Sequence, residues 1–154
     1  MIVKVQAILI HDGQLVVVRE RRRGFERMAL PGGRVHDRES VADALVRGVA
    51  KTTRIDLEPV RLIYVAEIPG LYAAPDLHLV WLAELSDATA PIPDGLLVEL
   101  GDERLPSLDP PIMNMIAADA EDGWPEAPRW ISYVEPHRRR AVGGRTRSKR
   151  LTAG

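Results

Sequence analysis

The stretch Leu30-Pro31-Gly32-Gly33 stands directly before a segment that is rich in basic side chains. Four of its basic residues are Arg38, Arg47, Lys51 and Arg54. A lysine offers phosphate a point charge, and an arginine offers it a planar fork of two donors. These four side chains are therefore suited to pairing with phosphate if they face one cavity.

A helix is expected to position those side chains. Ser40 is a favourable N-cap, and the apolar residues Val41, Leu45 and Val49 recur every four residues. This spacing predicts a helix over about 40–53 with one broad apolar face. Arg47 and Lys51, four residues apart, then share an exposed ridge of that helix.

Strands are expected on both sides of the helix. Residues 3–10 and 15–18 are rich in β-branched side chains and are joined by an Asp-Gly turn, so 3–19 should form a hairpin. The charged run 19–27 is predicted as a loop. Further strands are expected at 28–30, 61–68, 77–85, 96–100 and 130–134, and a second helix at 111–120 with Pro111 in its first turn. This order predicts an α/β fold with a mixed β-sheet sandwiched between α-helices.

Charge divides the chain into two parts. The 154 residues suggest one domain, and residues 137–154 hold seven of the 21 Lys and Arg residues but none of the 22 acidic ones. We therefore expect a folded domain over 1–136 and a basic, disordered C-terminal tail over 137–154. Such a tail attracts phosphates non-specifically or folds back on the acidic body.

The lead-in and the spacing Gly33–Glu39–Arg47 resemble the Nudix hydrolase superfamily, over roughly residues 3–120. Val49 and Ile55 also fall where that family's sequence box has apolar residues. The resemblance implies a Nudix-like sheet between helices and cleavage of a nucleoside diphosphate joined to another group. It also implies that Glu39 and Arg47 are what remains here of the catalytic box.

The chain departs from the box at the positions that bind metal in the family. The family has glutamates there, whereas this chain has Gly48, Lys51 and Thr52. Mg²⁺ is held by hard oxygen ligands, and in the family these glutamates are joined by a loop carbonyl, which corresponds to Gly32. Gly48 offers no ligand, Thr52 offers a neutral hydroxyl, and Lys51 places a cation where a cation should bind. No metal is therefore expected at the usual box positions.

Three hypotheses for function follow. The first is a nucleotide- or phosphate-ligand-binding protein with weak or no Mg-dependent hydrolysis, in which Gly32, Gly33 and the four basic side chains face one cavity and bind the ligand. The second is an active Nudix pyrophosphohydrolase with relocated metal ligands. The acids available for that role are Glu39, Glu99 and Glu103. The third is a non-catalytic interaction module that uses the scaffold and the basic tail, so whether the chain is an enzyme stays open.

Cofactors, partners and location follow from the same features. No cofactor is expected, and Mg or Mn is expected under the hydrolase hypothesis alone. The expected partner is a small, nucleotide-like phosphate ligand. Nucleic acid is not expected except through the basic tail, and a homodimer is a possibility that the resemblance raises. The chain has no cysteine and no apolar run of the roughly 18 residues that a membrane helix needs, so we expect a cytoplasmic protein without a membrane partner.

Overall fold

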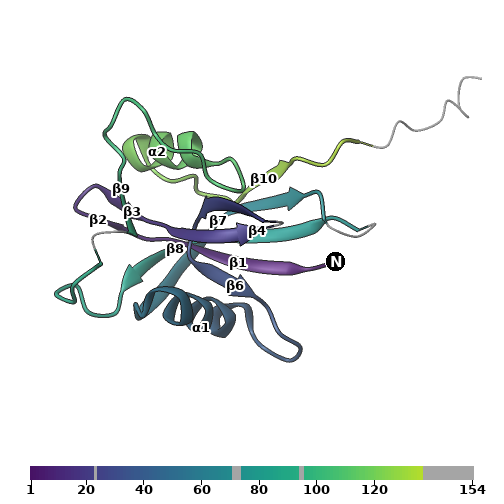
Figure 1. Cartoon of the computed structure of the whole chain (residues 1–154), viewed down its shortest axis with the longest axis horizontal. Coiled ribbons are helices and arrows are strands. Elements are labelled where there is room, and N and C mark those ends of the chain that lie inside the picture. The colour runs from purple at the N-terminus through teal and green to yellow at the C-terminus, as the bar shows by residue number, and fades with distance from the viewer. Residues whose placement is uncertain (23, 71–73, 94–95, 137–154) are drawn as a thin grey trace, which may run out of the picture.

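The computed structural model describes residues 1–22, 24–70, 74–93 and 96–136, which form a mixed α/β unit (Figure 1). Its strands are β1 (Val3–Ile8), β2 (Ile10–His11), β3 (Gln14–Val16), β4 (Val18–Arg22), β5 (Phe25–Ala29), β6 (Gly32–Arg34), β7 (Leu57–Ile68), β8 (Asp76–Leu85), β9 (Leu97–Glu99) and β10 (Arg129–Ser132). The helices within those ranges are α1 (Val41–Thr53) and α2 (Met113–Asp122), and neither is long and apolar enough to cross a membrane. The predicted basic tail, 137–154, lies outside the described residues.

A five-stranded mixed sheet is the centre of the fold. Its strand order is β10-β7-β8-β1-β6. The pairs β1–β8 and β10–β7 are parallel, whereas β1–β6 and β7–β8 are antiparallel. Helix α1 covers one face and α2 lies on the opposite face, as Figure 1 shows. The expected α/β fold, a mixed sheet sandwiched between helices, is confirmed.

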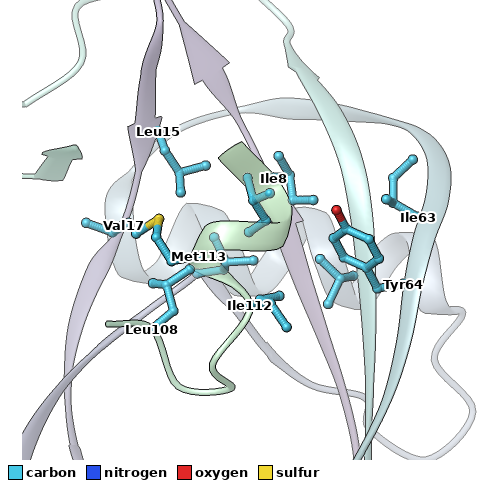
Figure 2. Packing of buried hydrophobic residues seen from close by; sticks show 11 residues of the cluster. Ile8, Leu15, Val17, Ile63, Tyr64, Leu108, Ile112 and Met113 are labelled. Carbon is cyan, nitrogen blue, oxygen red and sulfur yellow. The ribbon is translucent and has the colours of Figure 1, made fainter. Parts of the chain in front are cut away.

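Two apolar cores fill the space between the sheet and the helices. Alternate residues of β1 point to opposite faces, so Val5 packs toward α1 while Ile8 packs toward α2. On the α2 side, Ile8 joins a fully buried cluster that contains Ile112 and Tyr64 (Figure 2). Each fully buried aliphatic side chain contributes about 1.5–3 kcal/mol, so these two cores fix the sheet against its helices.

Helix α1 begins and ends where its sequence indicates. The Ser40 hydroxyl accepts a hydrogen bond from the backbone N–H of Asp43 (3.0 Å), so Ser40 is the N-cap. At the other end, Arg54 adopts the left-handed conformation (φ 58°) and its N–H donates to the carbonyl of Ala50 (2.8 Å). The predicted helix over 40–53 is confirmed.

The region around the first hairpin differs from the prediction. Within residues 3–19, hairpin pairing is confined to the tip, where Ile10 pairs with Leu15 and His11 with Gln14. Strand β1 instead pairs with β8 and β6, because its side chains are buried on both faces and suit the middle of a sheet. The predicted loop over 19–27 is wrong as well: β4 and β5 form an antiparallel hairpin that turns at Gly24 (φ 81°). Its apolar base, Val18 opposite Ala29, is buried, and its charged side chains extend away from the core.

The later elements match with shifted ends. Helix α2 starts at Met113, so Pro111 precedes the helix and does not lie in its first turn, and Gly123 is its C-cap. Strands β7 and β8 occupy the predicted ranges, and β7 begins four residues earlier, at Leu57. The predicted final strand is β10, which lies at one edge of the sheet beside β7.

Candidate functional site

Helix α1 and strand β6 meet through backbone atoms at Gly48. A Cβ placed on Gly48 would lie 2.7 Å from the carbonyl carbon of Gly32, 2.8 Å from its oxygen and 2.8 Å from the Gly33 nitrogen. Real Cβ atoms do not approach other atoms so closely, so this contact requires glycine at position 48. The glycine pair thus touches the helix backbone at the position where the family box has a metal-binding glutamate.

The ion pair between Glu39 and Arg47 is formed with two hydrogen bonds. Arg47 Nε donates to Glu39 Oε2 (2.7 Å), and Nη2 donates to Oε1 (2.9 Å). The same Nη2 donates to the backbone carbonyl of Arg34 (2.7 Å), and the His36 N–H donates to Glu39 Oε1 (3.1 Å). The Glu39 side chain is 17% exposed and that of Arg47 is 34% exposed. The pair therefore ties α1 to β6 and to the loop that follows it.

These hydrogen bonds shift the ionisation of both partners. The bonds from Arg47 and from the backbone N–H of His36 lower the pKa of Glu39 to about 2. The bond to Glu39 in turn raises the pKa of Arg47 above its usual range. Both groups stay charged at neutral pH, so Glu39 is a weak base there.

The other predicted site residues lie on α1 and at its two ends. Lys51 is exposed in the last turn of α1, and the Thr52 hydroxyl donates to the carbonyl of Gly48 (3.0 Å). Arg54 caps the helix and lines a cavity of about 260 Å³ together with residues of the loop after β8. Arg38 is exposed in the loop before α1, with φ 63°. Of the four predicted ligand-binding side chains, Arg47 is engaged with Glu39, and Arg38, Lys51 and Arg54 are exposed.

The residues present do not fit a divalent metal at the box. Gly48 supplies no ligand, a Cβ at its position would lie 2.8 Å from the Gly32 carbonyl oxygen, and the Thr52 hydroxyl is bonded to the helix. Of the three acids considered for relocation, Glu39 is held by Arg47, Glu99 lies on β9, in a different sheet from β6, and Glu103 is exposed in the segment after β9. Over the described ranges, no three His, Asp or Glu side chains come close enough together to hold a metal ion.

A polar cavity of about 170 Å³ opens beside the glycine pair, on the sheet face opposite α1. The residues that line it are Lys4, Gln6, Glu20, Leu30, Gly32, Gly33, Arg34, His78 and Asp109. Lys4 lies directly opposite Arg34 on β6 and directly opposite His78 on β8. We call these three residues the basic row, because cross-strand partners project from the same face of a sheet. Sequence reasoning missed this row, although the alternation of Lys4 and Gln6 with apolar neighbours in β1 was a visible signal.

The floor of the cavity is buried and hydrogen-bonded. Gln6 is 5% exposed and His78 is 3% exposed, and His78 Nδ1 donates to Gln6 Oε1 (3.0 Å). Buried polar side chains cost stability unless they are paired, so this pair forms a polar floor beneath Lys4 and Arg34.

A second cavity, of about 420 Å³, adjoins the first through Asp109. It is lined by Glu26, Arg27, Met28, Ser107, Leu108, Asp109 and Pro111. The Asp109 carboxylate accepts a hydrogen bond from Arg27 Nη1 (2.9 Å), and its N–H donates to the carbonyl of Met28 (2.9 Å). The loop before α2 is thereby tied to the β4–β5 hairpin, and the two together form the walls of a two-part cleft.

Known proteins share this architecture. A NUDIX domain family model matches residues 2–109. The fold resembles an ADP-ribose pyrophosphatase from Streptococcus suis 89-1591 (20% identity, TM-score 0.59, covering 85% of this chain and 98% of that one). It also resembles a NUDIX hydrolase from Nitrosomonas europaea (15% identity, TM-score 0.61, covering 85% of this chain and 78% of that one). A UDP-X diphosphatase is similar as well (18% identity, TM-score 0.59, covering 84% of this chain and 66% of that one).

Because these sequence identities are low, the solved structures support the fold alone. No curated protein sequence matches the chain. The family model spans more than half of the chain and includes the glycine pair, the Glu39–Arg47 pair and the whole of α1. The chain therefore belongs to the NUDIX domain family.

Proposed function

We propose that this NUDIX-domain chain binds a phosphate-bearing, nucleotide-like ligand without a divalent metal and does not hydrolyse it. The observation that carries the proposal is the basic row beside Gly32 and Gly33 in the polar cavity. Like charges directly opposite each other on neighbouring strands are unfavourable, and a bound anion relieves that repulsion. Lys4 and Arg34 therefore replace Arg38, Lys51 and Arg54 as the phosphate-binding residues.

The other lining residues suit the rest of a nucleotide. Glu20 and Asp109 are acceptors for hydroxyl or amino groups, as a sugar or a base presents them. The adjoining cavity adds the apolar surfaces of Met28, Leu108 and Pro111. Ligand sites are commonly apolar clefts with a few convergent polar groups, and a two-part cleft of this kind suits a phosphate joined to an organic group.

Hydrolysis is left out of the proposal for a chemical reason. In metal-dependent phosphoryl chemistry the cation neutralises the phosphates and lowers the pKa of the attacking water. Gly48, Lys51 and Thr52 do not hold such a cation. Glu39, with a pKa of about 2, is too weak a base to activate water at neutral pH. Binding survives the loss of the metal because Lys4 and Arg34 supply positive charge directly.

Calorimetric titration in EDTA tests the proposal. The probes are pyrophosphate, ADP-ribose and UDP-glucose, which sample the ligand classes named for the structural neighbours. We expect saturable binding of at least one nucleotide probe without metal, and unchanged probe after incubation with Mg²⁺ or Mn²⁺. Binding that needs Mg²⁺, or release of a nucleoside monophosphate, would contradict the proposal. We also propose a cytoplasmic location, since a chain without cysteine is compatible with a reducing compartment.

A further inference from the structure

We infer that Gly48 is a positioning residue: it lets α1 dock on the glycine pair so that β6 presents Arg34 to the polar cavity, and the same contact bars a metal-binding carboxylate from position 48. The part that concerns Arg34 rests on the proposed function. The part that concerns the carboxylate rests on packing alone.

Strand β6 is held between two backbones. On the sheet side, a Cβ on Gly32 would lie 1.9 Å from the Val5 carbonyl oxygen. On the helix side, a Cβ on Gly48 would meet both Gly32 and Gly33 at under 3 Å, and a Cβ on Gly33 would lie 3.3 Å from the Gly48 Cα. Since neither side leaves room for a methyl group, a side chain added at position 48 must shift α1 or β6.

The residue next to Gly48 holds the same strand. Arg47 Nη2 donates to the carbonyl of Arg34 (2.7 Å), which is the residue whose side chain lines the cavity. Glu39 orients that guanidinium with two hydrogen bonds. Arg47 and Gly48, consecutive residues of α1, therefore contact β6 at Arg34 and at Gly32–Gly33.

Glycine at position 48 is unfavourable by intrinsic helix propensity. Alanine is the better helix former, so glycine inside a helix normally gains stability when it is replaced by alanine. Gly48 is buried, five residues from the end of α1, and faces a backbone. At this position the added methyl group must push α1 away from β6, so the sign of the usual effect reverses.

A carboxylate at position 48 meets the same obstacle. A glutamate carries a Cβ, which has no space while α1 lies against the glycine pair. Positions 51 and 52 are exposed and accept larger side chains freely. Restoring all three family glutamates therefore does not rebuild the metal site, because the backbone contact closes it.

The test is a pair of substitutions with a matched control. Gly48→Ala should lower the melting temperature by about 4 °C or more, whereas Gly101→Ala, which has no atom within 4 Å of its added Cβ, should not. Gly48→Ala should also weaken metal-free pyrophosphate binding by about tenfold in the parent chain. Because this effect acts through Arg34, Gly48→Ala should not weaken binding further in a chain that already carries Arg34→Ala. A Gly48→Ala variant that melts higher, or an equal loss of affinity in both backgrounds, overturns the inference. If the Gly48→Ala variant does not fold, Arg47→Lys replaces it in the same comparison of the parent chain with the Arg34→Ala background.

A second arm separates this inference from the proposed function. Arg34→Ala that leaves pyrophosphate binding unchanged would refute the proposed function and, with it, the positioning role. The packing claim is then decided by comparing K51E/T52E with G48E/K51E/T52E by Mn²⁺ titration and thermal melting. We expect the double variant to melt like the parent, the triple variant to melt lower, and neither to bind Mn²⁺. A triple variant that melts like the parent and binds Mn²⁺ at micromolar concentration overturns the packing claim.

Discussion

Substitution of Lys4 by glutamine should lower the affinity for a phosphate ligand and raise the stability of the ligand-free protein. Lys4 faces Arg34 on β6 across neighbouring antiparallel strands, and both line the polar cavity. A charge-assisted hydrogen bond is worth about 1.5–3 kcal/mol, so Lys4→Gln should weaken metal-free binding of a phosphate ligand by roughly 10- to 150-fold. Without ligand, the same change removes a like-charge contact that costs about 0.2–1 kcal/mol. Because Glu20 and Asp109 lie in the same cavity and offset part of that repulsion, we expect a gain of stability in the lower half of this range.

Two measurements and one control decide this prediction. Calorimetric titration with pyrophosphate in EDTA gives the affinity, and urea unfolding without ligand gives the free energy of unfolding. Lys51→Gln is the matched control, since it removes the same charge from the exposed end of α1. Weaker binding with equal or higher stability is expected for Lys4→Gln, and unchanged binding for Lys51→Gln. If Lys51→Gln weakens binding and Lys4→Gln does not, the phosphate site lies on the box helix and our reasoning is refuted.

Three further predictions concern the elements around the site. Glu39→Gln should lower the melting temperature near neutral pH. Because the folded pKa of Glu39, about 2, lies below the unfolded value of 4.5, the difference in melting temperature from the parent should shrink as the pH falls from about 5 toward 2. A difference that stays constant over this pH range in thermal melts would contradict the ion pair. Arg54→Gly should raise the free energy of unfolding by about 0.5–1 kcal/mol, since it relieves the left-handed conformation at the C-cap, and a loss in urea unfolding would mean that the arginine side chain stabilises its cavity. Tyr64→Phe should lower the free energy of unfolding by about 1–2 kcal/mol, because the buried Tyr64 hydroxyl donates to Asp119. Tyr133→Phe removes an exposed hydrogen bond and should lower it by less. Equal losses for the two variants would show that the buried hydrogen bond adds no stability.

The sequence indicates the elements with strong local signals. The cap at Ser40 and the apolar repeat through Val49 are contained within one helix, so they predict α1 without knowledge of the rest of the fold. The glycine pair and its spacing to Glu39 and Arg47 likewise indicate the family, because the whole motif lies within one short stretch of the chain. The ion pair between those two residues follows, because the loop and the helix that carry them are adjacent in the chain.

The cavity is not predictable in this way, because it is assembled by pairing between distant strands. Lys4, Arg34 and His78 are far apart in the chain, and their alignment depends on the register of β1 with β6 and β8. The β4–β5 hairpin escapes prediction because its charged residues resemble a loop, although its buried base anchors it as a ribbon. Gly48 likewise reads as a missing ligand in the sequence, and its contact with the glycine pair emerges when α1 is docked on the sheet.

A crystal structure of the chain grown with pyrophosphate and Mn²⁺ is the most direct test of metal-free phosphate binding. Anomalous scattering identifies Mn²⁺, and the electron density locates the phosphates independently of it. We predict pyrophosphate between Lys4 and Arg34 beside the glycine pair, with no manganese peak at the Gly32 carbonyl. A manganese ion bridging that carbonyl and the phosphates, with α1 moved away from Gly32 and Gly33, would contradict the account.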